Sequence, residues 1–190
     1  AINAMGTVIV RNNAGSGIEN RNNVTNDGEL LITDSGASGI LNLSGTFSNN
    51  GMISIFHADI NGVDNTLSAI FENATGATLS ISRIGANGIN HTPNAIFNSM
   101  GRIVIDSTGG DGINMEQLFV SNGDSILIGT NHPLTGTGTS VGCAIGGNGI
   151  NITSDGTYSA VGGATILIGD SDCPITENGI NNAGMFMTDG

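Results

Sequence analysis

The chain has 190 residues, of which 38% are hydrophobic, only 11% are charged and 31 are glycine. Its 16 acidic residues and four arginines give a net charge of −12 at pH 7. Such a surface repels phosphate backbones and anionic membranes, so nucleic acid is a poor candidate partner. There is also no apolar run of transmembrane length, and we expect no membrane insertion.

A Gly-Ile or Gly-Val dipeptide recurs along the whole chain, with steps of 22, 23, 26, 24, 37 and 30 residues between successive glycines. A period of this length is typical of a solenoid, in which each repeat forms one coil that stacks on the next. The seven members are Gly17-Ile18, Gly39-Ile40, Gly62-Val63, Gly88-Ile89, Gly112-Ile113, Gly149-Ile150 and Gly179-Ile180.

Each repeat contains three short apolar segments in a constant order. The first alternates apolar and polar residues, the pattern of a strand with one buried face, as in Val8/Val10, Leu30/Ile32, Ile53/Ile55, Leu79/Ile81, Ile103/Ile105, Ile126/Ile128 and Ile166/Ile168. The Gly-Ile pair is the second segment. The third contributes one large residue per coil: Ile2, Val24, Phe47, Phe71, Phe97, Val120 and Tyr158.

These segments predict an all-β fold, a single-stranded parallel β-helix with three short strands per coil and about seven coils. Residues 1–190 then form one β-solenoid domain. The usual preference of parallel crossover connections predicts a right-handed coil.

An asparagine follows each Gly-Ile pair at the second or third position after the glycine. In a stack of coils, such side chains form hydrogen-bonded ladders, so we interpret the column as structural rather than ligand-binding. Its members are Asn20, Asn42, Asn65, Asn90, Asn114, Asn151 and Asn182.

The two cysteines occupy the same place in successive repeats. Cys143 lies six residues before Gly149, and Cys173 lies six residues before Gly179. Stacked coils are about 4.8 Å apart, within the Cα separation that a disulfide accepts. We therefore predict a Cys143–Cys173 disulfide and an oxidising, extracellular or cell-surface location.

Two stretches, near residues 130–147 and 169–178, lengthen the last two coils and are expected to be loop insertions. Loops that leave a solenoid on one side often meet a partner. The sequence also opens and closes part-way through a coil, because Ala1 to Val10 matches Ala95 to Ile105 and the repeat stops after Phe186. Uncapped end strands predict end-to-end self-association, or continuation in a longer repeat chain.

No pattern in the sequence favours catalysis. One column carries Asp34, His57 and Arg83 in successive coils, but without an activated nucleophile or a second carboxylate in register, a weak surface ladder of charges is the better interpretation. Gly109 to Asn114 resembles one turn of a calcium-binding repeat but does not occur in tandem. We expect no enzyme activity and no cofactor, with surface Ca²⁺ as the weak alternative.

The repeat Gly-Ile-x-Asn…Phe-x-Asn-x-Gly-x-Ile-x-Ile resembles that of secreted bacterial parallel β-helix proteins, which include adhesins, autotransporter passengers and polymorphic outer-membrane proteins. Phe47-Ser48-Asn49-Asn50 and Phe97-Asn98 approximate the Phe-x-x-Asn element of the last group. The resemblance covers the whole chain. It implies a cell-surface or extracellular role and assigns no site residues.

The leading hypothesis is therefore an extracellular structural protein whose coils stack end to end into a fibre, sheath or adhesive stalk. The alternative is an adhesin or binding module that recognises a glycan or a host surface through its two loops. A carbohydrate-active enzyme is the third possibility, although the scattered acids do not form the paired carboxylates that glycosidic hydrolysis needs.

Overall fold

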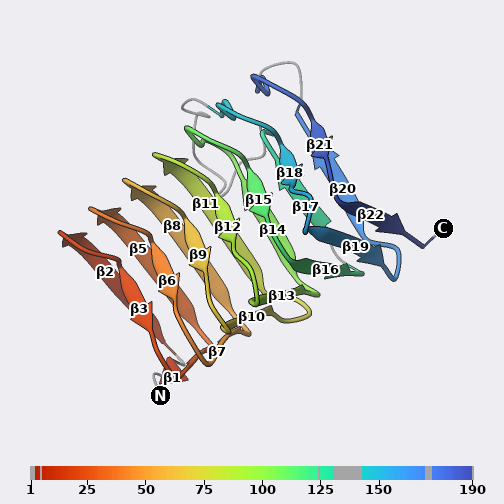
Figure 1. The fold of residues 1–190 in the computed structure, drawn as a ribbon. Helices are drawn as coiled ribbons and strands as arrows, with labels where there is room; N and C mark the ends of the chain where they lie inside the picture. Colours follow the sequence, from red (N-terminus) through yellow and green to blue (C-terminus); the bar gives the residue numbers. More distant parts are fainter. Residues whose placement is uncertain (1–2, 5, 124, 131–142, 170–172, 190) are drawn as a thin grey trace.

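The structure is a computed structural model that describes residues 3–4, 6–123, 125–130, 143–169 and 173–189. These residues form a β-solenoid whose coils follow one another in chain order, with the two ends of the chain at opposite ends of the stack (Figure 1). Every pair of neighbouring strands in the described residues is parallel, and each strand pairs with its equivalents in the coils before and after. The all-β, three-stranded coil predicted from the repeat is confirmed.

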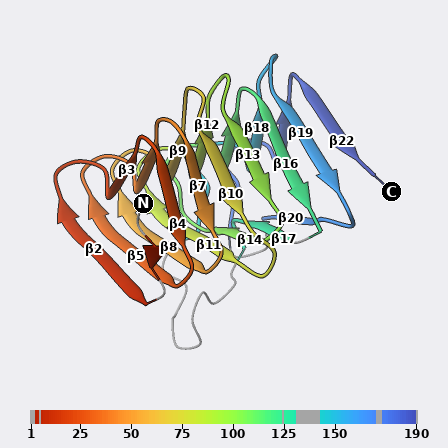
Figure 2. The ribbon, with the colours of Figure 1, turned by 90° about the horizontal axis from the view of Figure 1, so that it is seen from below.

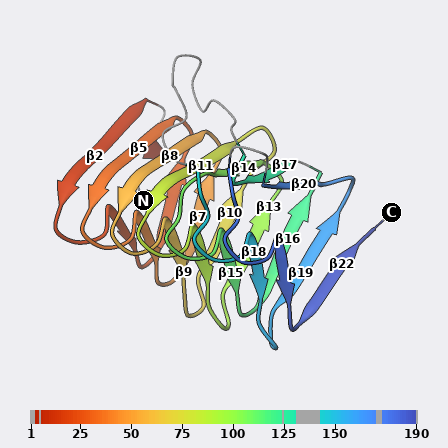
Figure 3. The same cartoon turned by 90° about the horizontal axis from the view of Figure 1, so that it is seen from above.

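The strands belong to three sheets, which line three faces of the stack (Figures 2 and 3). Sheet 1 contains eight strands: β1 (Asn3–Ala4), β4 (Asn23–Asn26), β7 (Thr46–Asn49), β10 (Ile70–Asn73), β13 (Ile96–Ser99), β16 (Leu118–Asn122), β19 (Thr157–Val161) and β22 (Met185–Thr188). Sheet 2 contains seven: β2 (Thr7–Asn13), β5 (Glu29–Ser35), β8 (Met52–Ala58), β11 (Thr78–Ile84), β14 (Arg102–Ile105), β17 (Ser125–Ile128) and β20 (Thr165–Ile168). Sheet 3 also contains seven: β3 (Ile18–Asn20), β6 (Ile40–Asn42), β9 (Val63–Asn65), β12 (Ile89–His91), β15 (Ile113–Met115), β18 (Ile150–Ile152) and β21 (Ile180–Asn182).

The core lies between the sheets and consists of apolar columns that run the length of the stack. In sheet 2 the inward positions carry the predicted aliphatic pairs, and in the middle coils these side chains are fully buried. The column in sheet 1 is aromatic, with stacked rings 4.5 to 5.6 Å apart: Phe47, Phe71, Phe97, Phe119, Tyr158 and Phe186. Large planar side chains in register therefore form a continuous stack on the sheet 1 side of the core.

One predicted member of this aromatic column is wrong. Phe119, not Val120, pairs in register with Phe97 and is completely buried, whereas Val120 is only half-buried. Successive residues of a strand point to opposite faces, so a shift of one position exchanges inside for outside. The sequence Leu-Phe-Val in β16 is apolar on both faces, and the repeat period alone did not determine which residue points inward.

The structure explains why the second segment of each coil begins with glycine. At six of the seven glycines, an added Cβ atom would lie 2.5–2.8 Å from the carbonyl oxygen of the equivalent glycine in the next coil. It would also lie 2.3–2.6 Å from an isoleucine Cγ2 atom of sheet 2 in that coil. Only glycine allows the coils to approach this closely. The six positions are Gly17, Gly39, Gly62, Gly88, Gly112 and Gly149.

The described residues omit 131–142 and 170–172, so most of the predicted loop insertion near 130–147 and three residues of the one near 169–178 lie outside them. After each gap the chain pairs again with the preceding coil. Single parallel β-bridges join Ile84 to Thr108, Thr108 to Ile145, and Ile145 to Ile175. The described residues contain no helix that is long and apolar enough to cross a membrane.

Candidate functional site

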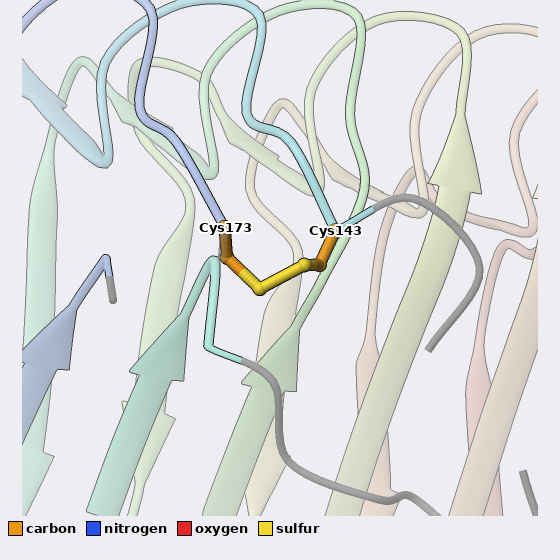
Figure 4. The surroundings of a disulfide bond; sticks show 2 residues. All are labelled: Cys143 and Cys173. Carbon is orange, nitrogen blue, oxygen red and sulfur yellow. A yellow bond between two sulfur atoms is a disulfide. The ribbon is translucent and has the colours of Figure 1, made fainter. Parts of the chain in front are cut away.

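The predicted disulfide is present and joins the last two coils. Cys143 and Cys173 both lie just before the turn that leads into sheet 3, and their Cα atoms are 5.0 Å apart (Figure 4). Both cysteines are buried. Disulfides form and persist in oxidising compartments, so this bond indicates an oxidising, extracellular setting.

The predicted single asparagine column divides into two ladders on opposite faces of sheet 3. Asn20, Asn42 and Asn65 are the third residues of their strands and point into the core. Each side-chain Nδ2 donates to the next coil: Asn20 to Asn42 Oδ1 at 2.7 Å, and Asn42 to Asn65 Oδ1 at 2.8 Å. Further donation to backbone oxygens of neighbouring turns, such as Ile70 O at 3.0 Å, satisfies these buried amides.

The other predicted asparagines form an outer ladder that runs in the opposite direction. Asn90, Asn114 and Asn151 are the second residues of their strands, and each Nδ2 donates to the preceding coil, at 2.9 to 3.0 Å. The ladder begins at the carboxylate of Asp64 and ends at Asn181. Asn182, the last predicted member, instead lies in register with Ile152 in the inner column. The one-residue difference in spacing decided the face, as it did at Phe119.

A third ladder, in sheet 1, was not predicted. Asn26, Asn49 and Asn73 end their strands and are almost completely buried. Asn26 donates to Asn49 Oδ1 and Asn49 donates to Asn73 Oδ1, both at 2.8 Å. The signal in the sequence is an asparagine two residues after the large residue of the third segment in these three coils, at Val24, Phe47 and Phe71.

The inner ladder of sheet 3 ends at a buried histidine. Asn65 Nδ2 lies 3.3 Å from His91 Nδ1, and His91 Nε2 lies 2.9 Å from the carbonyl oxygen of Leu118. Because an amide nitrogen only donates, Nδ1 accepts and Nε2 carries the proton. Burial lowers the pKa of His91 to about 4, so the ring is neutral at pH 7.

In the column of Asp34, His57 and Arg83, the first two side chains contact each other and the third lies against an aromatic ring. His57 Nδ1 lies 2.9 Å from Asp34 Oδ1, while the Arg83 guanidinium lies 4.8 Å above the ring of Phe56. The hydrogen bond to His57 lowers the pKa of Asp34, and both side chains are about half exposed on the outside of the stack. All three residues have positive φ angles of 56° to 64° and turn the chain at the edge of sheet 2.

Asp111 takes part in a hydrogen-bonded contact between coils. Asp111, in the turn that resembles a calcium-binding repeat, accepts hydrogen bonds from the backbone and side chain of Asn148 in the next coil. In the part of the chain that the structure describes, no group of three or more histidine, cysteine or carboxylate side chains could hold a metal ion.

Among the described residues, the two end coils differ from the middle coils in leaving core columns uncovered. At the amino-terminal end, a cavity of about 310 Å³ is lined mainly by Val8, Val10, Ile18, Val24 and Leu30. At the other end, Ile166, Ile168 and Phe186 are half-buried and Ile180 is 41% exposed, although the equivalent side chains one coil earlier are fully buried. Three edge strands with unpaired backbone groups accompany each of these surfaces.

In comparisons with known proteins, the chain matches no family model, no curated protein and no solved structure. The end coils, with their edge strands and uncovered core columns, are the candidate functional surfaces that the described residues provide.

Proposed function

We propose that the chain is an extracellular structural protein whose solenoid stacks head to tail on further copies, forming a fibre, sheath or adhesive stalk at the cell surface. The resemblance of the repeat to bacterial cell-surface β-helix proteins and the disulfide support this location. A head-to-tail contact joins two different surfaces, and it generates an open filament when the rotation between successive copies does not close a ring.

The observation that carries the proposal is Gly179. The other six glycines of this column are required because the next coil approaches within 2.8 Å of an added Cβ atom. At Gly179 no such coil is present, and the nearest atom to an added Cβ is 3.9 Å away. A glycine at this position is explained if a further coil lies on β21 as it does on β18.

The charge distribution favours a head-to-tail contact over a tail-to-tail contact. All four arginines lie within the first 102 residues, which also contain seven acidic residues, whereas the remaining residues contain nine acidic residues and no arginine. The net charges of the two parts are therefore about −3 and −9. Opposing two of the more acidic carboxy-terminal ends would cost more electrostatic energy than opposing a carboxy-terminal end to an amino-terminal end.

Negative-stain electron microscopy and light scattering across a range of protein concentrations test the proposal. We expect filaments one solenoid wide above a critical concentration. Monodisperse monomers at every concentration would contradict the proposal.

A matched pair of variants tests the role of the end surface. Gly149→Ala introduces a Cβ atom 2.5 Å from Gly179 O within one chain, so it destabilises the fold itself. Gly179→Ala has free space within the chain and leaves the thermal midpoint unchanged, but it prevents a further coil from approaching. We expect Gly179→Ala to abolish filaments. Filaments of normal length from this variant would show that no coil packs on β21.

A further inference from the structure

We propose that the outer face of sheet 2 in one copy packs side by side against the outer face of sheet 1 in a second copy of the chain. The contact uses the sides of the solenoid and not its ends, so it goes beyond head-to-tail stacking and does not depend on it. Two exposed apolar strips, one on each face, and the charges beside them lead to this pairing.

The first strip lies on the outer face of sheet 1 and consists of the first residues of three neighbouring strands. Ile70 of β10 pairs in register with Ile96 of β13, and Leu118 of β16 continues the column because Phe119 pairs with Phe97. Ile96 and Leu118 are 39% and 38% exposed, whereas the phenylalanine that follows each of them points inward and is fully buried. These three aliphatic residues form the sheet 1 strip.

The second strip lies on the outer face of sheet 2, in the first three coils. Ile9 of β2 pairs with Leu31 of β5, and Phe56 of β8 lies two residues beyond the partner of Leu31 along its strand. Ile9 is 48% and Phe56 is 40% exposed. Single exposed apolar residues are ordinary, but residues aligned in neighbouring coils form a contiguous patch, which marks a contact with another molecule. These three residues form the sheet 2 strip.

Sheet 2 is the one face whose described strands carry a net positive charge when histidine is neutral. They contain three of the four arginines of the chain, against two carboxylates. These charged residues are Arg11, Arg83 and Arg102, and Glu29 and Asp34. The described strands of sheet 1 contain only Glu72, and those of sheet 3 contain Glu19 and Asp64. In a chain with a net charge of −12, a contact that opposes sheet 2 to an acidic face is therefore favoured over contacts between like faces.

Opposite charges also lie at the margins of the two strips. The Arg83 side chain is exposed, and its guanidinium lies 4.8 Å above the ring of Phe56. Glu72 lies two residues after Ile70 and therefore on the same face as the sheet 1 strip, where it accepts a hydrogen bond from Ser48 Oγ at 3.1 Å. Among the described residues, neither Arg83 nor Glu72 forms a salt bridge. Both charges are therefore available to a second copy.

Antiparallel solenoid axes align the two faces. Turning a copy so that its outer face meets another reverses the direction of its strands, and reversing its axis reverses them again. The strands of the facing sheets then run in the same direction, within the roughly 30° that face-to-face packing of sheets allows. Coils repeat at about 4.8 Å in both faces, so β8, β5 and β2 of one copy lie opposite β10, β13 and β16 of the other.

This arrangement brings the strips and the charges together at the same time. The facing pairs are Ile9 with Leu118, Leu31 with Ile96, Ser54 with Ile70, and Phe56 and its neighbour Arg83 with Glu72. Packed sheets lie about 10 Å apart, which allows such side chains to interdigitate. Sheets 1 and 2 lie on different sides of the stack (Figure 2), so one copy can join two neighbours, one through each strip.

A charge exchange tests the pairing. The parent is the full chain with Gly179→Ala, the change expected to block stacking, and sedimentation velocity over a range of concentrations measures association. We expect Glu72→Arg and Arg83→Glu each to raise the concentration for half-association roughly tenfold, because each opposes two like charges. The double variant opposes unlike charges again and should return to within about threefold of the parent.

Asp155→Arg is the matched control for the charge exchange. It changes the net charge as much as Glu72→Arg does, from an exposed turn outside both strips. A smaller net negative charge alone strengthens association, so weakening by Glu72→Arg and none by Asp155→Arg assigns the effect to the contact. A double variant that associates no better than the single variants overturns the proposal, as does a parent chain that is monomeric at every concentration.

A second pair of variants tests the apolar part of the contact. Ile96→Ser removes exposed apolar surface from the sheet 1 strip, and we expect the concentration for half-association to rise roughly tenfold. Ile60→Ser is the control, because Ile60 is 47% exposed in a turn outside both strips and should change association by less than about twofold. Equal effects of the two variants would contradict a contact at the sheet 1 strip.

The side contact and head-to-tail stacking fail separately. Filaments of the unmodified chain that never associate sideways overturn the side contact and leave stacking in place. Association that responds to the charge exchange, in a chain that forms no filaments, supports the side contact and contradicts stacking.

Discussion

The two halves of the solenoid fill the same inward positions with different chemistry. In sheet 1 one column carries Asn26, Asn49 and Asn73 and then changes to small residues, and in sheet 3 the column of Asn20, Asn42 and Asn65 changes to His91, Met115 and Ile152. An amide is tolerated in the core only where the next coil supplies a donor or acceptor. The inward columns of the amino-terminal half therefore link successive coils by side-chain hydrogen bonds, whereas the same columns in the carboxy-terminal half pack small and apolar side chains, and one disulfide joins the last two coils.

The largest expected effect comes from the disulfide of the carboxy-terminal half. Cys143→Ser with Cys173→Ser opens a loop of 30 residues, and we expect the free energy of unfolding to fall by about 3.5 kcal/mol. Urea unfolding of the variant and the oxidised wild type measures the difference. If the carboxy-terminal coils of the variant unfold at a urea concentration at which the amino-terminal coils are still folded, the two halves unfold separately.

The next effect comes from a ladder of the amino-terminal half. Asn49→Leu leaves Asn73 Oδ1 and the carbonyl of Thr78 without the donor that they now have, so we expect a loss of roughly 3 kcal/mol. The control is Ser121→Ala in the same column of the other half, which should cost about 1 kcal/mol. If both variants lose the same free energy of unfolding in urea, side-chain hydrogen bonds in this column stabilise the two halves equally.

The boundary between the halves is expected to respond to pH through His91. The pKa of His91 is about 4 in the folded chain and near 6.5 in the unfolded chain. As the pH falls, the unfolded state therefore binds a proton at His91 at a higher pH than the folded state does. Its contribution to stability is complete above pH 6.5 and is lost as the pH falls from 6.5 toward 4. Between pH 7 and pH 5 we expect a loss of about 2 kcal/mol.

His91→Met, which repeats the residue of the next coil, isolates this effect. Asp106 responds in the opposite sense, because burial raises its pKa to about 6 and protonation then favours the folded state. Asp106 is present in both wild type and variant, so the difference between their pH–stability curves belongs to His91. A constant difference from pH 7 to pH 5 would contradict the neutral, buried histidine.

The smallest effect is expected on the outside of the amino-terminal half. Asp34→Asn and His57→Gln each remove one partner of a hydrogen-bonded contact whose two side chains are about half exposed, so we expect no measurable change in thermal midpoint. The asparagine variant also suits the left-handed backbone at this position. A clear destabilisation would show that the outer column contributes to the fold as the inner ladders do.

Several features of this protein follow from its sequence alone. The Gly-Ile period and the alternation in the first segment predicted three parallel strands per coil, and the equal offsets of Cys143 and Cys173 predicted their disulfide. These inferences succeed because a solenoid repeats its contacts at the period of its sequence, so residues at equal offsets become neighbours.

Other features were decided by the tertiary structure. A shift of one residue reverses the face of a strand, so only the register showed that Phe119 replaces Val120 in the core and that the asparagines form two ladders. The cavity beside Val24 and the unpaired Oδ1 atom of Asn26 are such features, because whether each is covered depends on which coils are in contact. Sequence offsets predict which residues share a column, but packing determines which of their atoms remain without a partner.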